Sequence, residues 1–407
     1  MIWARPVAIV NARVVADDGA VADSVRFSTR ILGIGSRPRH GDTVIDAAGG
    51  VVLPGLINAH DHLELNHYGQ LKGRERYANA TEWIDDLRPR LSGDPAIRGG
   101  RAHPLGERLF IGALKNLLAG VTMVAHHNPF YAELRRTMPI RIVRRYGWAH
   151  SFELERQPAG ARGEPGGEIV VRWRATPADA PFMVHLAEGV DAAAGGELAR
   201  LEALGCLQSN TVLVHGVGID GVGWQRVARA GAGMVWCPAS NVFLFGRTAW
   251  IRELLDRNGD GPRIALGTDS RITGSRDLLD ELRVARAAAP VTAAELFAMV
   301  TRNAASLLRQ PRAGRIAVGL PADLMMPGGN GTSPPLETLL GARRRDVRLV
   351  VVDGRPLVGD ADMLPVFEAR RVTPRPMRVD DAPKIGQSGL ARRIAGCPIA
   401  EPGVQAT

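Results

Sequence analysis

Short apolar runs alternate with helix-like stretches along most of this 407-residue chain, and this alternation constrains the fold more than any other feature. Buried parallel strands read as continuous apolar runs, and each needs a crossover to reach its neighbour. The pattern therefore predicts an α/β fold, either a barrel or a doubly wound sheet. The strand-like runs are VVLPGLINAH, VTMVAHH, PFMVHLAE, TVLVHGV, AGMVWC and RIALGTD.

Length and local texture divide the chain into three parts. The alternating region, 54–311, has the size of a barrel of about 250 residues, so we favour a distorted (β/α)8 TIM barrel. Short strand-like runs fill 1–53 and return at 312–372, so these segments are expected to build one small β-sandwich domain. Residues 373–407 are expected to form an irregular tail. The stretch between Tyr146 and Phe182 is loop-rich, so a fourth barrel strand is expected to be short, distorted or missing.

The formal net charge of +9 raises the question of a polyanionic partner. The basic residues are spread along the chain, and neither a known nucleic-acid module nor a long basic stripe with interleaved aromatics accompanies them. We therefore expect an arginine-rich solvated surface and no nucleic-acid partner.

The cysteines and the apolar runs indicate the cellular compartment of the protein. Cys206, Cys237 and Cys397 are odd in number and far apart, which suits a reducing compartment. The N-terminus lacks the apolar core of a signal peptide, and no run reaches the roughly 18 apolar residues of a membrane span. A cytoplasmic protein with no membrane contact is expected.

Histidines and acidic residues concentrate at the ends of the strand-like runs. His60 and His62 flank Asp61, and alternation along a strand points both imidazoles the same way. His185 precedes Glu188 by three residues, and His215 and Asp269 end two later runs. The carboxyl ends of barrel strands meet at one mouth, where neutral imidazoles and a carboxylate suit Zn²⁺ or Fe²⁺.

Each of these signals also has an ordinary structural explanation. H-x-H pairs occur at surfaces, His215 alone suits a core histidine, and Asp269 could cap the helix that follows. Four separate strand ends with the right groups are hard to obtain by chance. A hydrolytic metal site is therefore predicted.

Taken in order, the motifs PGLINAHDHL, VHLAEG, VLVHGVGI, CPASN and ALGTDS resemble the amidohydrolase superfamily. Within it they are similar to the cytosine deaminase, guanine deaminase and triazine hydrolase branch, over residues 5–360. The resemblance implies one divalent metal held by His60, His62, His185 and Asp269. It also implies that Glu188 shuttles protons, that His215 hydrogen-bonds the nucleophile or the intermediate, and that Asp269 orients the nucleophile.

Two-metal members of this superfamily bridge their ions with a carboxylated lysine on the fourth strand. Lys72, Lys115 and Lys384 are all predicted to lie elsewhere, so a single metal is favoured. Glu153 and Glu155 are the alternatives that could hold a second ion.

Residues near the expected mouth are candidates for substrate contact. Glu64 and His67 follow the first strand, and Trp83 lies where similar enzymes cover the substrate with an aromatic ring. Arg247 and Arg271 would suit an anionic substrate through bidentate hydrogen bonds. His126 and His127 end the second strand, and neither is predicted to be a metal ligand.

The most consistent function is hydrolysis of a C–N bond, by deamination of a cyclic amidine, a guanidine or a heteroaromatic amine. Ring-opening hydrolysis of a cyclic amide or imidazolone would use the same residues. A non-catalytic binding module is the alternative of a different class, and retention of the whole residue set argues against it. The expected partner is a small-molecule substrate, and a homodimer is expected only by analogy.

Overall fold

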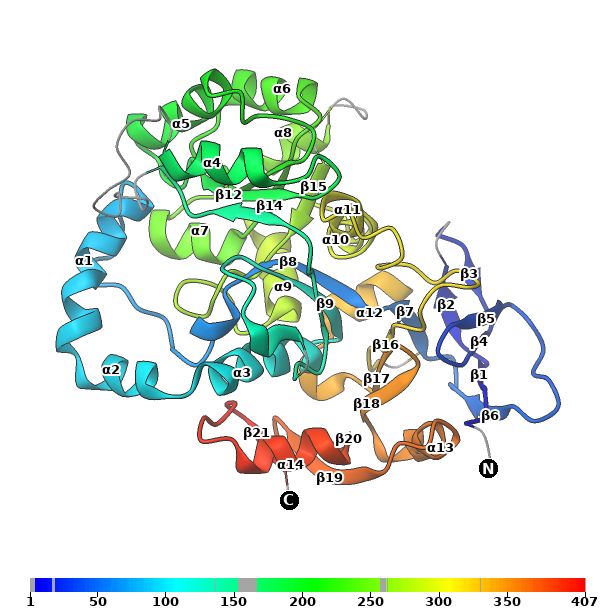
Figure 1. The fold of residues 1–407 in the computed structure, drawn as a ribbon. Helices are drawn as coiled ribbons and strands as arrows, with labels where there is room; N and C mark the ends of the chain where they lie inside the picture. The colour runs from blue at the N-terminus through cyan, green and yellow to red at the C-terminus, as the bar shows by residue number, and fades with distance from the viewer. Residues whose placement is uncertain are drawn as a thin grey trace.

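Parallel strands with helices around them form the centre of the molecule (Figure 1). The computed structural model describes residues 4–406 except 17–18, 136, 153–166, 257–260, 262 and 330. One parallel sheet has the order β10-β9-β8 and the other the order β11-β12-β13-β14-β15. The predicted α/β class is confirmed. The strands are β8 (Leu56–Asp61), β9 (Val121–His126), β10 (Arg141–Ile142), β11 (Gly147–Ala149), β12 (Phe182–Leu186), β13 (Thr211–His215), β14 (Gly233–Trp236) and β15 (Arg263–Leu266).

Several helices of this region begin where a short polar side chain caps them. The side chains of Asn79, Asp191, Asp220 and Asp277 each accept a backbone N–H from the first turn of the helix that follows. In the described chain, none of the helices combines the length and apolar character needed to cross a membrane. The helices are α1 (Ala80–Gly93), α2 (Pro95–Ala102), α3 (Leu105–Leu118), α4 (Gly167–Ala175), α5 (Ala192–Ala203), α6 (Gly221–Arg229), α7 (Pro238–Phe245), α8 (Ile251–Leu255), α9 (Leu278–Ala288), α10 (Ala293–Met299) and α11 (Arg302–Leu307).

Strands β10 and β11 are two halves of one bent strand. β10 pairs in parallel with β9, and β11 pairs in parallel with β12. Only residues 143–146 separate them, which is too short for the crossover that two neighbouring parallel strands require. Among the described residues, the bent strand therefore lies where strands three and four were expected, and a separate fourth strand is missing.

Side chains alternate between two buried clusters along the parallel strands. Those of the inner cluster come from strands of both parallel sheets and pack together, and the residues between them pack against the helices. Inner members are Ile57, Ala59, Met123, Ala125, Met183, Val212, Val214, Val235 and Ala265.

The free edges of the two parallel sheets meet between β8 and β15. The backbone N–H of Asp269 donates to the carbonyl oxygen of His60 at 3.1 Å. A Cβ at Gly267 would lie 2.7 Å from the Cβ of His60, so only glycine permits this approach. The loop after β15 is thereby held against the end of β8.

Both ends of the chain contribute to one sheet, as the sequence predicted. Its order is β21-β19-β20-β18-β17-β16-β7-β2-β3, and a separate sheet has the order β5-β4-β1-β6. The N-terminal strands are β1 (Val7–Val10), β2 (Arg13–Val15), β3 (Val21–Ala22), β4 (Val25–Phe27), β5 (Ile31–Ile34), β6 (Thr43–Asp46) and β7 (Val51–Pro54). The C-terminal elements are β16 (Leu324–Met326), α12 (Pro335–Gly341), β17 (Leu349–Val352), β18 (Arg355–Gly359) and α13 (Leu364–Ala369).

The expectation of an irregular tail was wrong. The tail forms β19 (Pro374–Val379), β20 (Ala382–Gln387), α14 (Ser388–Gly396) and β21 (Val404–Ala406). β20 pairs with β18, which extends the shared sheet, and the tail lies along the lower edge of Figure 1. The Arg393 guanidinium of α14 lies 3.9 Å from the ring centroid of Phe110 on α3. Sheet pairing and this contact order a segment whose composition alone reads as loop.

Helix α3 packs directly on the backbone that follows the H-x-H motif, and we predict that Gly112 is required there. A Cβ at Gly112 would lie 2.3 Å from the carbonyl oxygen of Leu63. Gly112→Ala should therefore lower the free energy of unfolding by roughly 1–3 kcal/mol, measured by urea denaturation of metal-free protein.

Gly196 provides the matched control, because it lies in α5 where an added Cβ would meet no neighbouring group within 4 Å. Gly196→Ala should leave stability unchanged or raise it by up to about 1 kcal/mol. Equal stability of the two variants would contradict the proposed close packing.

Candidate metal centre

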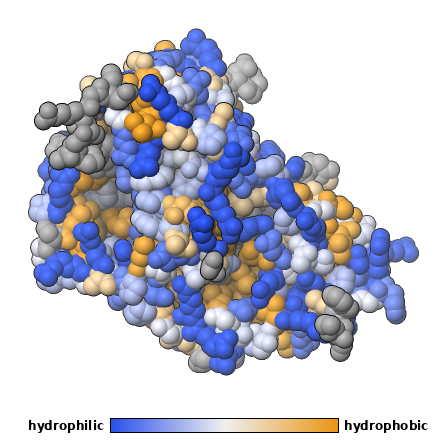
Figure 2. Space-filling view, in the orientation of Figure 1, coloured by the Kyte–Doolittle hydropathy of each residue, from blue (hydrophilic) through white to orange (hydrophobic). Residues whose placement is uncertain are grey.

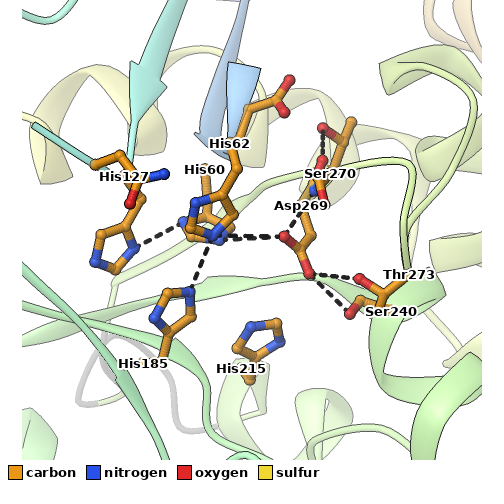
Figure 3. A network of polar contacts seen from close by, with 12 residues as sticks. His60, His62, His127, His185, His215, Ser240, Asp269, Ser270 and Thr273 are labelled. Atoms are coloured by element: carbon orange, nitrogen blue, oxygen red, sulfur yellow. Dashed lines mark hydrogen bonds and ion pairs between the residues drawn. The ribbon is translucent and has the colours of Figure 1, made fainter. Parts of the chain in front are cut away.

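Four predicted histidines and the predicted Asp269 converge at one buried point (Figure 3). His60 lies next to the last residue of β8, and His62 follows that strand. His185 and His215 come from β12 and β13, and Asp269 follows β15. Potential ligand atoms of His60, His185 and His215 lie within 4.8 Å of one another, as do those of His60, His62 and Asp269. The structure therefore brings together the residues that the strand ends predicted.

Distances between the donor atoms fit a bound cation. The Nε2 atoms of His62 and His185 are 3.3 Å apart, and Asp269 Oδ1 lies 3.7 Å from Nε2 of both His60 and His62. Two ligands at about 2.05 Å from a tetrahedral zinc ion are themselves about 3.3 Å apart. The buried Nε2 of His60 has no hydrogen-bond partner in the described structure. A divalent metal would satisfy these atoms together.

Backbone carbonyls at the end of β11 determine which imidazole nitrogens face the site. Nε2–H of His127 donates to the carbonyl oxygen of Ala149 at 2.9 Å, so its Nδ1 accepts from His60 Nδ1–H at 3.1 Å. Nδ1–H of His185 donates to the carbonyl oxygen of His150 at 2.9 Å. Both arrangements leave the Nε2 lone pairs of His60 and His185 free for a metal.

The electrostatics of the site favour neutral imidazoles and an ionised carboxylate. Burial, together with the nearby imidazoles, lowers the pKa of His62 and of His185 well below the ordinary value. Burial opposes ionisation of Asp269, but the neighbouring imidazoles of His60 and His62 hold its pKa well below the usual range. Neutral histidine and ionised aspartate are the forms that bind metals.

Hydroxyl groups fix the orientation of the Asp269 carboxylate. Ser240 and Thr273 donate to Oδ2 at 2.9 and 2.7 Å, and the backbone N–H of Ser270 donates to Oδ1 at 2.7 Å. Oδ1 is the oxygen nearest to the imidazoles. The carboxylate therefore presents one oxygen to the candidate ligands, while the hydroxyls hold the other.

Glu188 and His215 form a second pair beside the donor atoms. Glu188 Oε1 lies 3.5 Å from His215 Nε2, and Nδ1–H of His215 donates to Asn241 Oδ1 at 2.8 Å. Burial, with the charges of Asp269 and Glu197, raises the pKa of Glu188 well above its ordinary value. Burial lowers the pKa of His215 to about 4. Burial therefore favours the protonated form of the Glu188 carboxyl group and the neutral form of the His215 imidazole.

Unusual backbone geometry directs two of these side chains and the residue that precedes Glu188. Val212 and Val214 belong to the inner cluster, so alternation alone would turn His215 toward the helices. His215 (φ 73°), Asp269 (φ 54°) and Ala187 (φ 52°) instead adopt left-handed conformations, which cost energy outside glycine. A carboxylate oxygen of Glu197 accepts the Ala187 N–H at 2.6 Å and supports that turn. Strain of this kind concentrates at functional sites.

A buried polar network behind the ligands was missed from the sequence. Lys115 is fully buried, and its Nζ lies 3.2 Å from Asp61 Oδ2 and donates to the carbonyl oxygen of Asp269 at 3.3 Å. Asn116 Nδ2 also donates to Asp61 Oδ2, at 2.8 Å. The available signal was a lysine and an asparagine within the apolar helix-like run RLFIGALKNLLAG. His127, Asn241, Ser240 and Thr273 were likewise not predicted to support the site.

The candidates that follow β8 lie in different surroundings. Glu64 accepts a hydrogen bond from Asn128, and burial raises its pKa to about 7. The ring of His67 lies against Tyr68, with ring centroids 3.9 Å apart.

Trp83 belongs to an apolar cluster beside the loop that follows His215. Its Nε1 donates to the carbonyl oxygen of Leu71 at 2.9 Å. Figure 2 shows hydrophobic side chains around a hollow on the left of the molecule, where Figure 1 has α1 and α7. The cluster comprises Tyr77, Trp83, Val217, Phe243, Leu244 and Phe245.

The structure contradicts the role predicted for Arg271. Its guanidinium is buried and makes a bidentate ion pair with Glu401, at 2.6 and 2.8 Å, so it is directed into the protein and not toward a substrate. Arg247 is exposed, and its Nη2 donates to the carbonyl oxygen of Val217 at 3.4 Å. Glu153 and Glu155, the alternatives for a second metal, lie outside the described residues.

Comparison with known proteins agrees with this geometry. The amidohydrolase family model matches residues 175–357, which hold His185, Glu188, His215 and Asp269. Over these residues the chain matches the amidohydrolase family. It is 28% identical to a 5-methylthioadenosine/S-adenosylhomocysteine deaminase of Haloarcula marismortui, over 82% of this chain and 87% of that protein. The superfamily predicted from the motifs is therefore confirmed.

Solved amidohydrolase-fold structures share this architecture. The zinc complex of atrazine chlorohydrolase from Arthrobacter aurescens superposes with a TM-score of 0.71 at 22% identity, over 90% of this chain and 99% of that one. An adenosine deaminase from Xanthomonas campestris with bound zinc gives a TM-score of 0.67 at 19% identity, over 90% and 97%. Because these sequence identities are low, the similarity shows a shared fold and nothing more.

Glu281, on α9, predicts a pH dependence of folding. It is fully buried, accepts the Ala239 N–H at 2.9 Å, and burial raises its pKa from 4.5 to about 8. The folded protein thus holds a proton that the unfolded chain releases, so this contribution is complete below pH 4.5 and is lost as pH rises toward about 8. Between these values, the stability of wild type relative to Glu281→Gln should fall by up to about 1.4 kcal/mol per pH unit.

Urea denaturation of metal-free protein at several pH values would measure this slope. Glu253→Gln changes an exposed carboxylate on the neighbouring α8 and should follow the wild-type curve. Parallel curves for wild type and Glu281→Gln would show that Glu281 is ionised in both states.

Proposed function

We propose that this protein is a metal-dependent hydrolytic deaminase that acts on adenosine-type nucleosides. The observation that carries the proposal is the buried carboxyl group of Glu188 beside His215 and the metal-ligand group, with a pKa raised by burial. Aminopurine nucleosides are favoured as substrates because a curated relative is a 5-methylthioadenosine/S-adenosylhomocysteine deaminase, and a fold neighbour is an adenosine deaminase.

One divalent ion would be held by His60, His62, His185 and Asp269. Neutral imidazoles and a carboxylate suit Zn²⁺ and Fe²⁺, and zinc is favoured because two fold neighbours contain it. When bound, the metal would lower the pKa of a water molecule from about 15.7 to near neutral and so supply a nucleophile.

Glu188 would move both protons of the reaction. Deamination adds water to the amine-bearing ring carbon, and loss of ammonia then leaves a carbonyl group on the ring. One proton of the water must reach the ring nitrogen and the other must reach the departing amine. Burial raises the pKa of Glu188 well above its ordinary value and so favours a carboxyl group that can protonate the ring nitrogen and then relay the second proton.

His215 and Asp269 would orient the attacking water. Because His215 donates its Nδ1–H to Asn241, its Nε2 lone pair is an acceptor for a hydrogen of that water. The ionised Asp269, held by Ser240 and Thr273, offers a second acceptor. Fixed acceptors reduce the orientational cost of the attack.

The surroundings of the site suit a flat, largely apolar ring. Val217 lies two residues after His215 and packs in the same apolar cluster as Trp83 and Phe245. We place the base against this cluster and assign Glu64 to hydrogen bonding with polar groups of the substrate. Arg247 at the rim is retained as a candidate for contact with an anionic substituent.

We further propose that 54–311 form one distorted barrel, with 1–53 and 312–372 as a companion β domain. The shared inner cluster and the hydrogen bond between Asp269 and His60 support joining the two parallel sheets. With β10 and β11 counted as one bent strand, the described part of the barrel has seven parallel strands.

Ring-opening hydrolysis of a cyclic amide or imidazolone is the second candidate. Its chemistry needs the same nucleophile and the same proton shuttle, and it differs in releasing no ammonia. The residues at the site therefore fit both reactions equally, and a measurement of ammonia release with a panel of substrates distinguishes them.

Glu188→Gln should abolish deamination without removing the metal. Glutamine keeps the size of the side chain but cannot relay a proton, so kcat should fall by at least about 100-fold. Ammonia release would be measured with adenosine, 5-methylthioadenosine, S-adenosylhomocysteine, cytosine, guanine, aminotriazines and cyclic amidines. Metal content would be measured in parallel.

Glu202→Gln is the control, because it changes an exposed carboxylate on α5 that pairs with Arg226. It should leave ammonia release at the wild-type rate. Absence of ammonia release by metal-loaded wild type across the panel would overturn the deaminase proposal, and product analysis with cyclic amides would then test ring opening.

Metal removal should reversibly inactivate the enzyme. Dialysis against a chelator should abolish ammonia release, and one equivalent of Zn²⁺ or Fe²⁺ should restore it. His185→Ala should prevent restoration, because it removes one of the four donors. Full activity in the metal-free protein would contradict the assigned ligand set.

A further inference from the structure

The C-terminal tail contributes one fully buried carboxylate, Glu401, to the polar network behind the candidate metal centre. From its contacts, we propose that Glu401 is a positioning residue for the metal centre, acting through Arg271 on the two loops that carry the ligands. The inference rests on the proposed metal site and adds a role for a segment outside the alternating region.

Arg271 is the residue through which Glu401 would act, since it lies two residues after Asp269. Glu401 accepts from both terminal nitrogens of its guanidinium, at 2.6 and 2.8 Å. Nε donates to the carbonyl oxygen of Arg276 at 2.9 Å, and Nη1 donates to that of Asn66 at 3.3 Å. These bonds hold the loop after β15 against the loop after β8.

Asn66 joins the same two loops from the other side. Its Oδ1 accepts from the backbone N–H of Arg271 at 3.1 Å and from Lys115 Nζ at 2.7 Å. Its Nδ2 donates to Asp61 Oδ1 at 2.7 Å and to the carbonyl oxygen of His62 at 3.1 Å. Hydrogen bonds thus run without a break from Glu401 to the backbone of a ligand histidine.

Charge makes Glu401 necessary to this arrangement. Among the described residues, it is the only carboxylate that forms an ion pair with Arg271, whereas Arg344 pairs with both Glu401 and Asp380. Without the charge of Glu401, Arg271 would be a buried guanidinium without a counter-ion. Such a group tends to move toward solvent, and here it would draw the Asp269 loop with it.

The tail is anchored well enough to act as a fixed support. Glu401 lies between α14 and β21, and β21 pairs with β19. The backbone N–H of Asp380 donates to the carbonyl oxygen of Gly403 at 2.7 Å, which closes the segment around Glu401. The position of the carboxylate is therefore set by sheet pairing and not by the metal loops themselves.

Glu401→Gln tests the role, with Asp380→Asn as the matched control. Both substitutions remove one carboxylate charge from the same ion cluster, but in the described structure Asp380 pairs with Arg344 and Arg276 and forms no ion pair with Arg271. Asparagine also tolerates the left-handed backbone at this position (φ 46°). Both variants are expected to unfold at a lower temperature than wild type.

The two variants should differ at the metal. In chelator competition, Glu401→Gln should weaken Zn²⁺ affinity by about tenfold or more, as supporting residues of metal sites do, while Asp380→Asn stays near wild type. The visible absorption of the Co²⁺-loaded protein should change only in Glu401→Gln. With an active substrate, kcat should fall and KM should stay constant. Glu401→Asp should restore part of the affinity.

Arg271→Met provides the second test if Glu401→Gln does not fold. It leaves Glu401 paired with Arg344 and removes only the link to the metal loops, so it should weaken Zn²⁺ affinity to a similar extent. Unchanged Zn²⁺ affinity and an unchanged Co²⁺ spectrum in Glu401→Gln, or in Arg271→Met as its replacement, would overturn the inference. A wild type that binds metal but releases no ammonia would instead overturn the proposed activity alone.

Discussion

The structure depends on holding several electron-pair donors around one buried point. The Nε2 atoms of His60, His62 and His185 and the carboxylate of Asp269 are all directed there. Burying such donors without a compensating cation is unfavourable, so the chain has to supply the energy that keeps them in place before a metal binds. Much of the surrounding architecture serves this requirement.

Backbone geometry supplies the first level of support. The bent strand β10–β11 lies next to β12, which brings the carbonyl oxygens of Ala149 and His150 to the rings of His127 and His185. Left-handed residues then turn His215 and Asp269 toward the site. A separate fourth strand is missing among the described residues. The ligand set is nevertheless complete, because the third strand takes the place of the fourth beside β12.

Much of the centre could be predicted from the sequence because its ligands occupy strand ends. Apolar runs locate the strands, and parallel strands of one fold end at the same mouth, so His60, His185, His215 and Asp269 could be assembled without coordinates. The supporting residues were less accessible. Lys115 looks like one charge on a helix, and only packing against Asp61 and Asn66 shows that it is buried. Arg271 was assigned to a substrate because its partner, Glu401, is distant in the sequence.

The local sequence pattern was sufficient to predict the α/β class, the order of the ligand residues along the strands, and a site of neutral imidazoles with a carboxylate. These properties follow from period, residue type and the direction of parallel strands, which act over a few residues. Tertiary structure decided the direction of the Arg271 guanidinium, the ordered state of the tail and the tautomers of His60 and His185. Each of these depends on a partner brought close by folding, because hydrogen bonds and ion pairs act at contact distance whatever the separation along the chain.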